Sequence, residues 1–309
     1  MTGASGFVGR RLLERLAAEG RPTVALSRRG TGLSNVRDVV VRDYADTEAL
    51  AEALQGVDSV VHLAARAHLD SQGAGDSALF RSANVDCTLS VARACLAAGV
   101  RRLVLVSSIG VNGSRSTDHP FTELDRPGPA EPYAVSKLEA ETELATLLRG
   151  TGVEYVILRP PLVYGPGCPG NFGRLVRLVA RAPIVPLGAL TAPRSFIYVD
   201  NLVDALLVAD RQTGLGGMTF LLADGRDVSV GEVVRRLAAE LRPNRSPVVD
   251  IPVWLLRALA RLVGRSADFD KLAAPLQIDA RAFSLATGWH APYDPTEGLR
   301  ETARQFVAM

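Results

Sequence analysis

The sequence predicts an α/β protein with a doubly wound parallel sheet and a smaller C-terminal domain. Three observations lead to this fold class. The chain opens on a glycine-rich turn, Thr2-Gly3-Ala4-Ser5-Gly6-Phe7-Val8-Gly9. Short β-branched runs then alternate with helical stretches as far as residue 160, as is typical of a parallel sheet covered on both faces. From residue 161 onward the alternation loosens, with proline and glycine clustered at 160–170, 183–193 and 214–217.

The elements are expected in the following order along the chain. Strands are predicted at 23–27, 39–41, 59–63, 102–107 and 155–159, and helices at 10–19, 80–98 and 132–149. Returning strands are predicted within 196–208 and at 218–222, and residues 228–309 are predicted to be mostly helical.

The strand that should precede the glycine turn is absent, because the sequence begins one residue before Thr2. Without that strand, its two neighbours would leave backbone groups unpaired in the middle of the sheet, which is costly. We therefore expect the first strand to be missing or truncated, with Met1 in place of its last residue and with the natural reading frame starting upstream.

Composition restricts the class of protein. The chain has 309 residues, 47% of them hydrophobic, and its 35 basic and 33 acidic residues are spread along its length, so we expect no nucleic-acid partner. Three cysteines, with no metal-ligand or disulfide spacing, favour a cytoplasmic protein without a metal site. No apolar run is long enough for a membrane span; Arg257 and Arg261 interrupt the nearest, 251–263, which we interpret as a surface or interface helix.

The glycines at positions 3, 6 and 9 have a chemical interpretation. They allow backbone N–H groups to approach a pyrophosphate at a helix N-terminus, which predicts a dinucleotide site; the alternative is an ordinary turn before a helix. Residues 1–160 would then form a dinucleotide-binding domain, with the returning strands of 196–208, and residues 161–309 mainly a substrate-binding domain. Ser27 and Arg28 end the second strand where NAD-binding proteins carry an acid, so NADP is favoured over NAD; exposed arginines are the alternative.

A tyrosine and a lysine four residues apart, Tyr133 and Lys137, share one face of the predicted helix 132–149. A neighbouring cation favours the phenolate, so we expect Lys137 to lower the pKa of Tyr133 and make it an acid or base near neutral pH. The sequence contains only two lysines, Lys137 and Lys271, which argues against chance. The Ser108 hydroxyl, after the strand 102–107, could share the same substrate oxygen.

Together these motifs resemble the extended short-chain dehydrogenases/reductases of the NAD-dependent epimerase/dehydratase family, which have a Rossmann-type fold. The resemblance spans nearly the whole chain. Besides the glycine turn and Tyr133 to Lys137, it is carried by Asp58, His62 to Ala65, Asn84, Ser107-Ser108, Arg159-Pro160, Val163 to Gly167 and Arg194 to Asp200.

The resemblance implies roles for individual residues. Tyr133 would be the general acid/base, Lys137 would hold the nicotinamide ribose, and Ser108 would hydrogen-bond the reacting oxygen. The implied cofactor-binding residues are Gly3, Ser5, Gly6, Phe7, Val8, Gly9, Ser27, Arg28, Asp43 near the adenine, Leu63, Ala64, Ala65, Tyr133, Lys137 and Pro160.

The resemblance also implies that Asn171 and Arg194 hold the diphosphate of a nucleotide-linked sugar. Arg194 could instead pair with an acidic side chain, and Asn171 could cap a helix beginning at Phe172. His62 and Asn84 are interpreted as structural residues. His68, His119 and His290 belong to no motif.

The implied reaction takes place at C4 of a UDP-hexose or UDP-N-acetylhexosamine, as 4-epimerisation or 4-keto reduction, in surface-polysaccharide synthesis. Ile109-Gly110 replace the paired carboxylates of dehydratases, which argues against dehydration, and Arg28 favours reduction. Asn112 stands where many epimerases have tyrosine, so the sugar stays open. The alternatives are an inactive dinucleotide-binding or sensor protein and a reductase of non-sugar carbonyls. A homodimer packed through helices 80–98 and 132–149 is also implied.

Overall fold

The computed structural model describes residues 1–309 except 34–35, 68–75, 244–246 and 309. Its strands are β1 (Val24–Ser27), β2 (Arg37–Val40), β3 (Ser59–His62), β4 (Arg102–Val106), β5 (Glu154–Arg159), β6 (Leu162–Tyr164), β7 (Pro193–Arg194), β8 (Phe196–Tyr198), β9 (Met218–Leu221) and β10 (Val228–Ser229). Its α-helices are α1 (Phe7–Ala18), α2 (Thr47–Ala53), α3 (Asp76–Phe80), α4 (Cys87–Ala98), α5 (Pro132–Leu148), α6 (Gly170–Arg181), α7 (Val199–Arg211), α8 (Val230–Leu241), α9 (Val253–Leu262), α10 (Ser266–Ala273), α11 (Arg281–Thr287) and α12 (Pro295–Ala308).

The parallel sheet confirms the predicted α/β class. Strands β3, β4, β5 and β9 pair in that order, and β1 pairs with β2, all in parallel. Thr2 joins the two parts, because it bridges Leu26 on β1 and His62 on β3. Met1 and Thr2 thus lie at the central position between β1 and β3, where the sequence analysis places the first strand.

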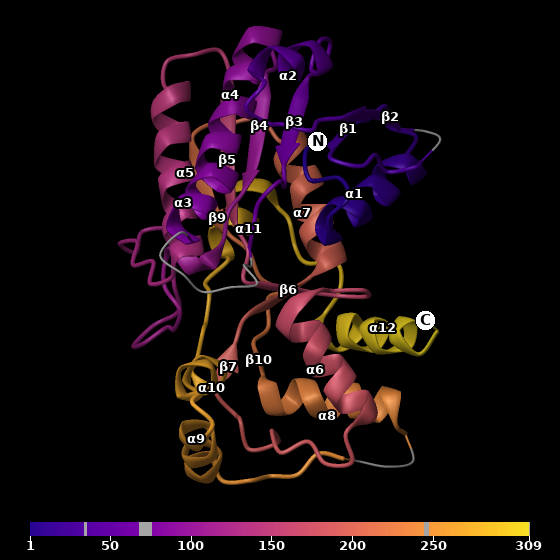
Figure 1. Ribbon diagram of the computed structural model, residues 1–309, viewed down its shortest axis with the longest axis vertical. Helices are drawn as coiled ribbons and strands as arrows, with labels where there is room; N and C mark the ends of the chain where they lie inside the picture. Colours follow the sequence, from indigo (N-terminus) through magenta and orange to yellow (C-terminus); the bar gives the residue numbers. More distant parts are fainter. Residues whose placement is uncertain (34–35, 68–75, 244–246, 309) are drawn as a thin grey trace.

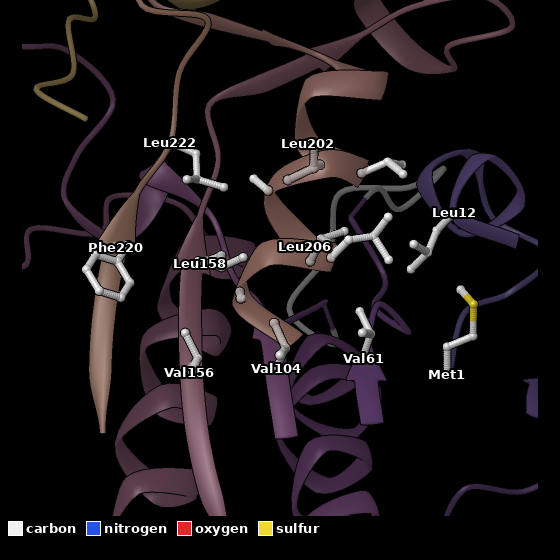
Figure 2. Packing of buried hydrophobic residues seen from close by; sticks show 14 of the residues in the cluster. Met1, Leu12, Val61, Val104, Val156, Leu158, Leu202, Leu206, Phe220 and Leu222 are labelled. Atoms are coloured by element: carbon white, nitrogen blue, oxygen red, sulfur yellow. The ribbon is translucent and has the colours of Figure 1, made fainter. Parts of the chain in front are cut away.

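Helices cover both faces of this sheet, in the upper half of Figure 1. Helices α1 and α7 pack on one face, and α2, α4 and α5 lie on the other, around a second cluster of buried apolar residues. Figure 2 shows the first cluster, which includes Leu12 of α1, Leu206 of α7 and Val104 of β4. In the lower half of Figure 1, α6, α8 and α12 enclose a separate core. Of the predicted helical C-terminal part, α8, α9, α10 and α12 lie there, whereas α11 packs on β9 in the upper half.

Two predicted elements differ in the structure. The helix expected over 80–98 is divided, because a π-helical segment, η1 (Arg81–Asp86), joins α3 to α4. The strands expected within 196–208 are limited to β8, which pairs with β6 outside the main sheet, while the rest of that segment is α7. The returning strand of the main sheet is β9, beside β5. The apolar residues of α7 repeat at helical spacing and are buried against α1, which explains why helix prevails there.

No helix in the described part of the chain has the length and apolar character needed to cross a bilayer. Within the same residues, no group of three or more His, Cys, Asp or Glu side chains is arranged to hold a metal ion.

Candidate active site

The glycine turn packs tightly between the strand position of Thr2 and helix α1. Gly3 has φ +66°, and a Cβ atom there would lie 2.7 Å from the backbone nitrogen of Ala64. A Cβ atom on Gly9 would lie 2.1 Å from the carbonyl oxygen of Gly3. Side chains are therefore excluded at both positions, and the backbone of the turn lies directly against the N-terminus of α1.

A cleft of about 600 Å³ opens above this turn at the carboxyl ends of β1 and β3. Nine residues of the predicted cofactor set line it together: Gly3, Ser5, Gly6, Ser27, Arg28, Asp43, Leu63, Ala64 and Ala65. Ligands of open α/β sheets bind in such a crevice outside the strand ends.

The structure places the other predicted cofactor residues elsewhere. Phe7 lines an adjoining cleft of about 470 Å³ between α1 and the Pro166-Gly167 turn. Val8 packs on the apolar core, and Gly9 lies beneath Gly3. Pro160 is buried, and its carbonyl accepts a hydrogen bond of 2.9 Å from the backbone N–H of Ile109, next to Ser108.

Two features of the cleft suit a dinucleotide. The Ser27 hydroxyl is buried without a hydrogen-bond partner among the described residues, although such an unsatisfied group costs about 1–3 kcal/mol. Arg28, the next residue, is exposed at the cleft. A ribose hydroxyl or phosphate would satisfy the serine, and the guanidinium could bind a phosphate, so these residues could hold the adenosine half of the cofactor.

Sequence reasoning missed several residues that also line the cleft. They are Tyr44, Ala45, Arg66, Ser82, Ala83, Asp86, Cys87 and Ser90. The only signal available was the series of small residues from 82 to 90, because small side chains on one helical face allow close approach of a ligand. The π-helical segment decides which of them turn to the cleft, and its position is not encoded by local periodicity.

The hydroxyl of Ser108 lies beside the first turn of α5. Ser108 follows β4 and caps the short 3₁₀ helix η2 (Ile109–Val111), where its Oγ accepts a hydrogen bond of 3.1 Å from the Gly110 N–H. A Cβ atom on Gly110 would lie 3.4 Å from that Oγ and 3.2 Å from the Cβ of Ala134. Gly110 is thus in contact with Ser108 on one side and, on the other, with the residue after Tyr133.

The expectation that Lys137 lowers the pKa of Tyr133 is wrong for the cofactor-free protein. Burial raises the pKa of Tyr133 to about 12, because its surroundings, including the Phe80 ring at 6.1 Å, replace the water that would stabilise a phenolate. Tyr133 therefore keeps its proton at neutral pH and is ready to donate it.

Lys137 is buried one turn further along α5, with 1% of its surface exposed. Burial lowers its pKa to about 8, and the nearby carboxylate of Glu141 opposes that shift. The lysine is therefore still mainly protonated at pH 7, and it titrates far closer to neutral than an exposed lysine does.

Asn84 connects the cleft to helix α5. Its side-chain amide donates to the carbonyl of Arg66 at 3.1 Å and to the Ser136 hydroxyl at 2.9 Å, and its oxygen accepts from the Arg66 N–H at 2.7 Å. Ser136 in turn donates to the carbonyl of Tyr133 at 2.7 Å. The structural role expected of Asn84 is confirmed, and the π-helical segment is what aims this side chain at both elements.

His62 is also a satisfied structural residue. Its Nδ1 lies 2.7 Å from the Thr2 hydroxyl and its Nε2 lies 3.1 Å from the Thr88 hydroxyl. Burial lowers its pKa to about 3, so the ring is neutral. Of the histidines outside any motif, His68 lies outside the described residues, and His119 and His290 are exposed.

A buried ion pair joins helix α5 to strand β5. Arg159 on β5 donates to both carboxylate oxygens of Glu141 at 2.5–3.2 Å, and its other arm donates to the Asn112 oxygen at 2.9 Å. The Asn112 amide donates to the Thr122 carbonyl at 3.0 Å. Asn112 is therefore engaged in structure, although the sequence suggested that it affects the choice of sugar.

We predict that Glu141→Gln destabilises the protein by about 3 kcal/mol or more, because removing one partner leaves the Arg159 charge buried and uncompensated. The matched control is Glu139→Gln on the same helix, whose pair with Arg81 is exposed and should contribute less than about 1 kcal/mol. Urea unfolding measures both, and equal losses would contradict the prediction.

The two predicted substrate residues take different positions. Arg194 donates to the carbonyls of Lys271 and Ala274 at 2.7 and 2.5 Å, where it caps the C-terminus of α10; no acidic partner lies within 4 Å among the described residues. Asn171 is exposed in the first turn of α6, which begins at Gly170, so it is not the cap of a helix starting at Phe172. Neither side chain lines the main cleft.

A doubly wound sheet, a glycine turn beneath a cleft, and a serine beside a helix that carries Tyr133 and Lys137 define a nicotinamide-dependent enzyme of the short-chain dehydrogenase class. The chain belongs to the NAD-dependent epimerase/dehydratase family, whose model matches residues 1–223. Its cofactor is a nicotinamide dinucleotide.

Two relatives and one solved structure illustrate the similarity. The UDP-glucose 4-epimerase of Vibrio cholerae is 34% identical over 99% of this chain and 94% of that protein. The N-acetyl-alpha-D-glucosaminyl-diphospho-ditrans,octacis-undecaprenol 4-epimerase of Escherichia coli O157:H7 is 28% identical over 99% of this chain and 95% of its own. The solved structure of MoeE5 in complex with UDP-glucose and NAD is 29% identical, with a TM-score of 0.79 and with 99% and 97% of the two chains covered.

Proposed function

We propose that this protein epimerises a UDP-hexose or UDP-N-acetylhexosamine at C4. Two contacts support the proposal. Gly110 lies against both Ser108 and Ala134, the neighbour of Tyr133, and Asn84 links Ser136 of α5 to Arg66, which lines the cleft. The similarity to a UDP-glucose 4-epimerase over almost the whole chain supports the choice of substrate class.

Each side chain has a distinct task in this proposal. The bound nicotinamide supplies hydride acceptance and return at the sugar carbon. Tyr133 moves the hydroxyl proton, Ser108 holds the reacting oxygen by a hydrogen bond, and Lys137 stabilises the phenolate and holds the nicotinamide ribose. Because burial raises the pKa of Tyr133, the positive charge of Lys137 is most needed when the phenol has lost its proton.

Dehydration is not part of the proposal. The positions of the dehydratase carboxylates are taken by Ile109 and Gly110, and the close approach of Ala134 Cβ leaves little space for a side chain at position 110.

Arg194 and Asn171 stay in the proposal as diphosphate ligands, on the condition that Arg194 has donors free for the diphosphate. Arg194 is already used as a cap of α10 through one of its nitrogens, so it would bind a diphosphate with its remaining donors. Burial lowers the pKa of Arg194, which indicates that a bound anion would stabilise its charge.

We propose NADP as the favoured cofactor, on the basis of Arg28 at the cleft. Arg28→Ala should weaken NADPH binding by about tenfold, because a charge-assisted contact with the 2′-phosphate is lost, and should leave NADH binding within about twofold. The control is Arg29→Ala, since Arg29 is also exposed but does not line the cleft. Fluorescence titration with NADPH and with NADH measures the affinities of the wild type and both variants. If Arg28→Ala weakened the binding of both cofactors equally, Arg28 would not be the ligand of the 2′-phosphate.

The second candidate function, favoured by Arg28, is net reduction of a 4-keto sugar by NADPH. One assay separates it from epimerisation. The purified protein is mixed with NADPH or NADH and a UDP-4-keto-6-deoxy-hexosamine, and separately with UDP-glucose and UDP-N-acetylglucosamine. Conversion of a UDP-sugar into its C4 epimer without net loss of nicotinamide absorbance supports the epimerase, and loss of absorbance with the keto sugar supports the reductase. If neither occurs, the inactive binding protein and the reductase of non-sugar carbonyls become the better interpretations.

The wider context is also a proposal. Residues 1–160, together with α7, would hold the cofactor and 161–309 mainly the substrate, and the epimerised sugar would supply surface-polysaccharide synthesis in the cytoplasm. A homodimer would pack through α4 and α5, near which Leu79 and Val135 are 48% and 42% exposed. Sedimentation equilibrium tests the dimer.

A further inference from the structure

Helix α9 exposes an apolar face at the end of the molecule opposite to the parallel sheet, at the bottom of Figure 1. Only Leu256 of this helix is buried, and the helix packs mainly on α10. The exposed fractions of the large apolar residues in and after α9 are high: Trp254 70%, Leu255 37%, Leu259 50%, Leu262 83% and Val263 69%.

These residues form one stripe. At 100° per residue, Trp254, Leu255, Leu259 and Leu262 fall within less than half of the helix circumference, on the side away from Leu256. Arg257 and Arg261 follow one edge of the stripe, and Arg265 comes just beyond the end of the helix. A surface helix normally turns its apolar side to the core, whereas α9 turns most of its large apolar side chains to the solvent.

The arginines in and just after α9 favour a negatively charged partner for this face. From 251 to 270 the chain carries three arginines, Arg257, Arg261 and Arg265, against two acidic residues, Asp268 and Asp270. The next basic residue, Lys271, pairs with Glu131. The pairs that Arg257 and Arg265 make with those aspartates, at 2.8 and 3.2 Å, are exposed and contribute little, so lipid phosphates can replace them. No ion pair involves Arg261 among the described residues.

A second copy of the chain fits this face less well. The ten residues of α9 form a strip about 15 Å long and about 10 Å wide, whereas a stable dimer buries about 800 Å² on each partner. A tryptophan and leucines bordered by arginines are the composition of helices that lie in the interface of a bilayer.

We propose that α9 docks the enzyme on the surface of an anionic phospholipid membrane, with Trp254, Leu259 and Leu262 in the headgroup region and the arginines on lipid phosphates. The docking is peripheral, and it does not depend on which sugar the enzyme transforms.

The test uses the full-length protein and vesicles of phosphatidylglycerol and phosphatidylcholine, or phosphatidylcholine alone, separated by flotation. The protein should float with the anionic vesicles at low salt and be released as the salt concentration rises. The sequence contains two tryptophans, and Trp289 is 7% exposed with its N–H donated to Asp204 at 2.8 Å. A blue shift of emission on binding should therefore come from Trp254 and disappear in Trp254→Phe.

The double variant Leu259→Gln/Leu262→Gln should bind anionic vesicles at least about tenfold more weakly, and Arg261→Gln about fivefold more weakly. Leu285→Gln is the matched control, because Leu285 is 86% exposed on α11, outside the proposed surface. Circular dichroism checks that each variant is folded.

Absence of flotation with anionic vesicles at low salt would overturn the proposal, as would equal binding by the double variant. A third outcome would also overturn it: the wild type does not bind vesicles, and sedimentation shows that it is an oligomer which the double variant cannot form. Helix α9 would then be a contact between copies of the chain.

Discussion

Replacing Tyr133 with phenylalanine should slow turnover by about a thousandfold while leaving dinucleotide affinity within about threefold. The proton relay is lost with the hydroxyl, and general acid/base groups contribute about 10²- to 10⁴-fold to rates. The ring itself stays, including its edge contact with Phe80, so the helix and the cleft should be undisturbed. Turnover is measured with the UDP-sugar or keto sugar that the wild type accepts, and affinity by titration of the reduced cofactor.

The control for this variant is Tyr293→Phe. Tyr293 is 41% exposed, and its hydrogen bonds within the described part of the chain, both with Asn201, involve only its backbone, so loss of its hydroxyl should leave turnover unchanged. Retained turnover in Tyr133→Phe would remove Tyr133 from its assigned role. A parallel loss of cofactor binding would instead indicate that the phenol is needed to build the site.

Lys137→Met should abolish most turnover and at the same time stabilise the cofactor-free protein. The ammonium is 1% exposed, and its pKa is lowered from 10.5 to about 8, a penalty on the charged form of about 3 kcal/mol at neutral pH. Methionine fills similar space without that penalty, so the gain should approach this value. The buried Lys137 charge would thus lower the free energy of unfolding of the wild type, while its cation serves the reaction at Tyr133.

The sign of the pH dependence follows from the direction of the shift. Between pH 8 and 10.5 the unfolded chain binds more protons at Lys137 than the folded protein does, so the stability of the wild type rises with pH in that window. The advantage of Lys137→Met should therefore be complete below pH 8 and vanish above about 10.5. Urea unfolding of the apoprotein from pH 7 to 10.5 measures it.

The other lysine of the chain supplies the matched control. Lys271 is 52% exposed and pairs with Glu131 at the surface, so Lys271→Met should change stability by less than about 1 kcal/mol at every pH. A pH-independent difference between wild type and Lys137→Met would show that burial does not depress the titration of Lys137.

Much of the fold could be predicted from the sequence because it is encoded locally. The glycine spacing gave the turn, since only glycine tolerates the φ of +66° at Gly3 and the contact beneath Gly9. The short β-branched runs and the helical stretches between them predicted the strands β1 to β5 and helix α5, and the spacing of four residues put Tyr133 and Lys137 on one face. Most of the predicted cofactor set lines one cleft because parallel strands end at the same edge of their sheet.

The tertiary structure alone decided the features that depend on contacts between distant segments. The partners of Arg194 are carbonyls some 80 residues away, and those of Asn112 lie on β5 and in the loop at Thr122; no local pattern specifies them. The pKa of Tyr133 rose where the neighbouring lysine suggested a fall, because burial depends on everything that packs around the phenol and here outweighs a single charge. The sequence by itself therefore determined the α/β class, the glycine turn and nine of the residues that line the cleft, because these are encoded locally. Packing between distant segments decided the π-helical segment, the electrostatics of the site and the outward apolar face of α9.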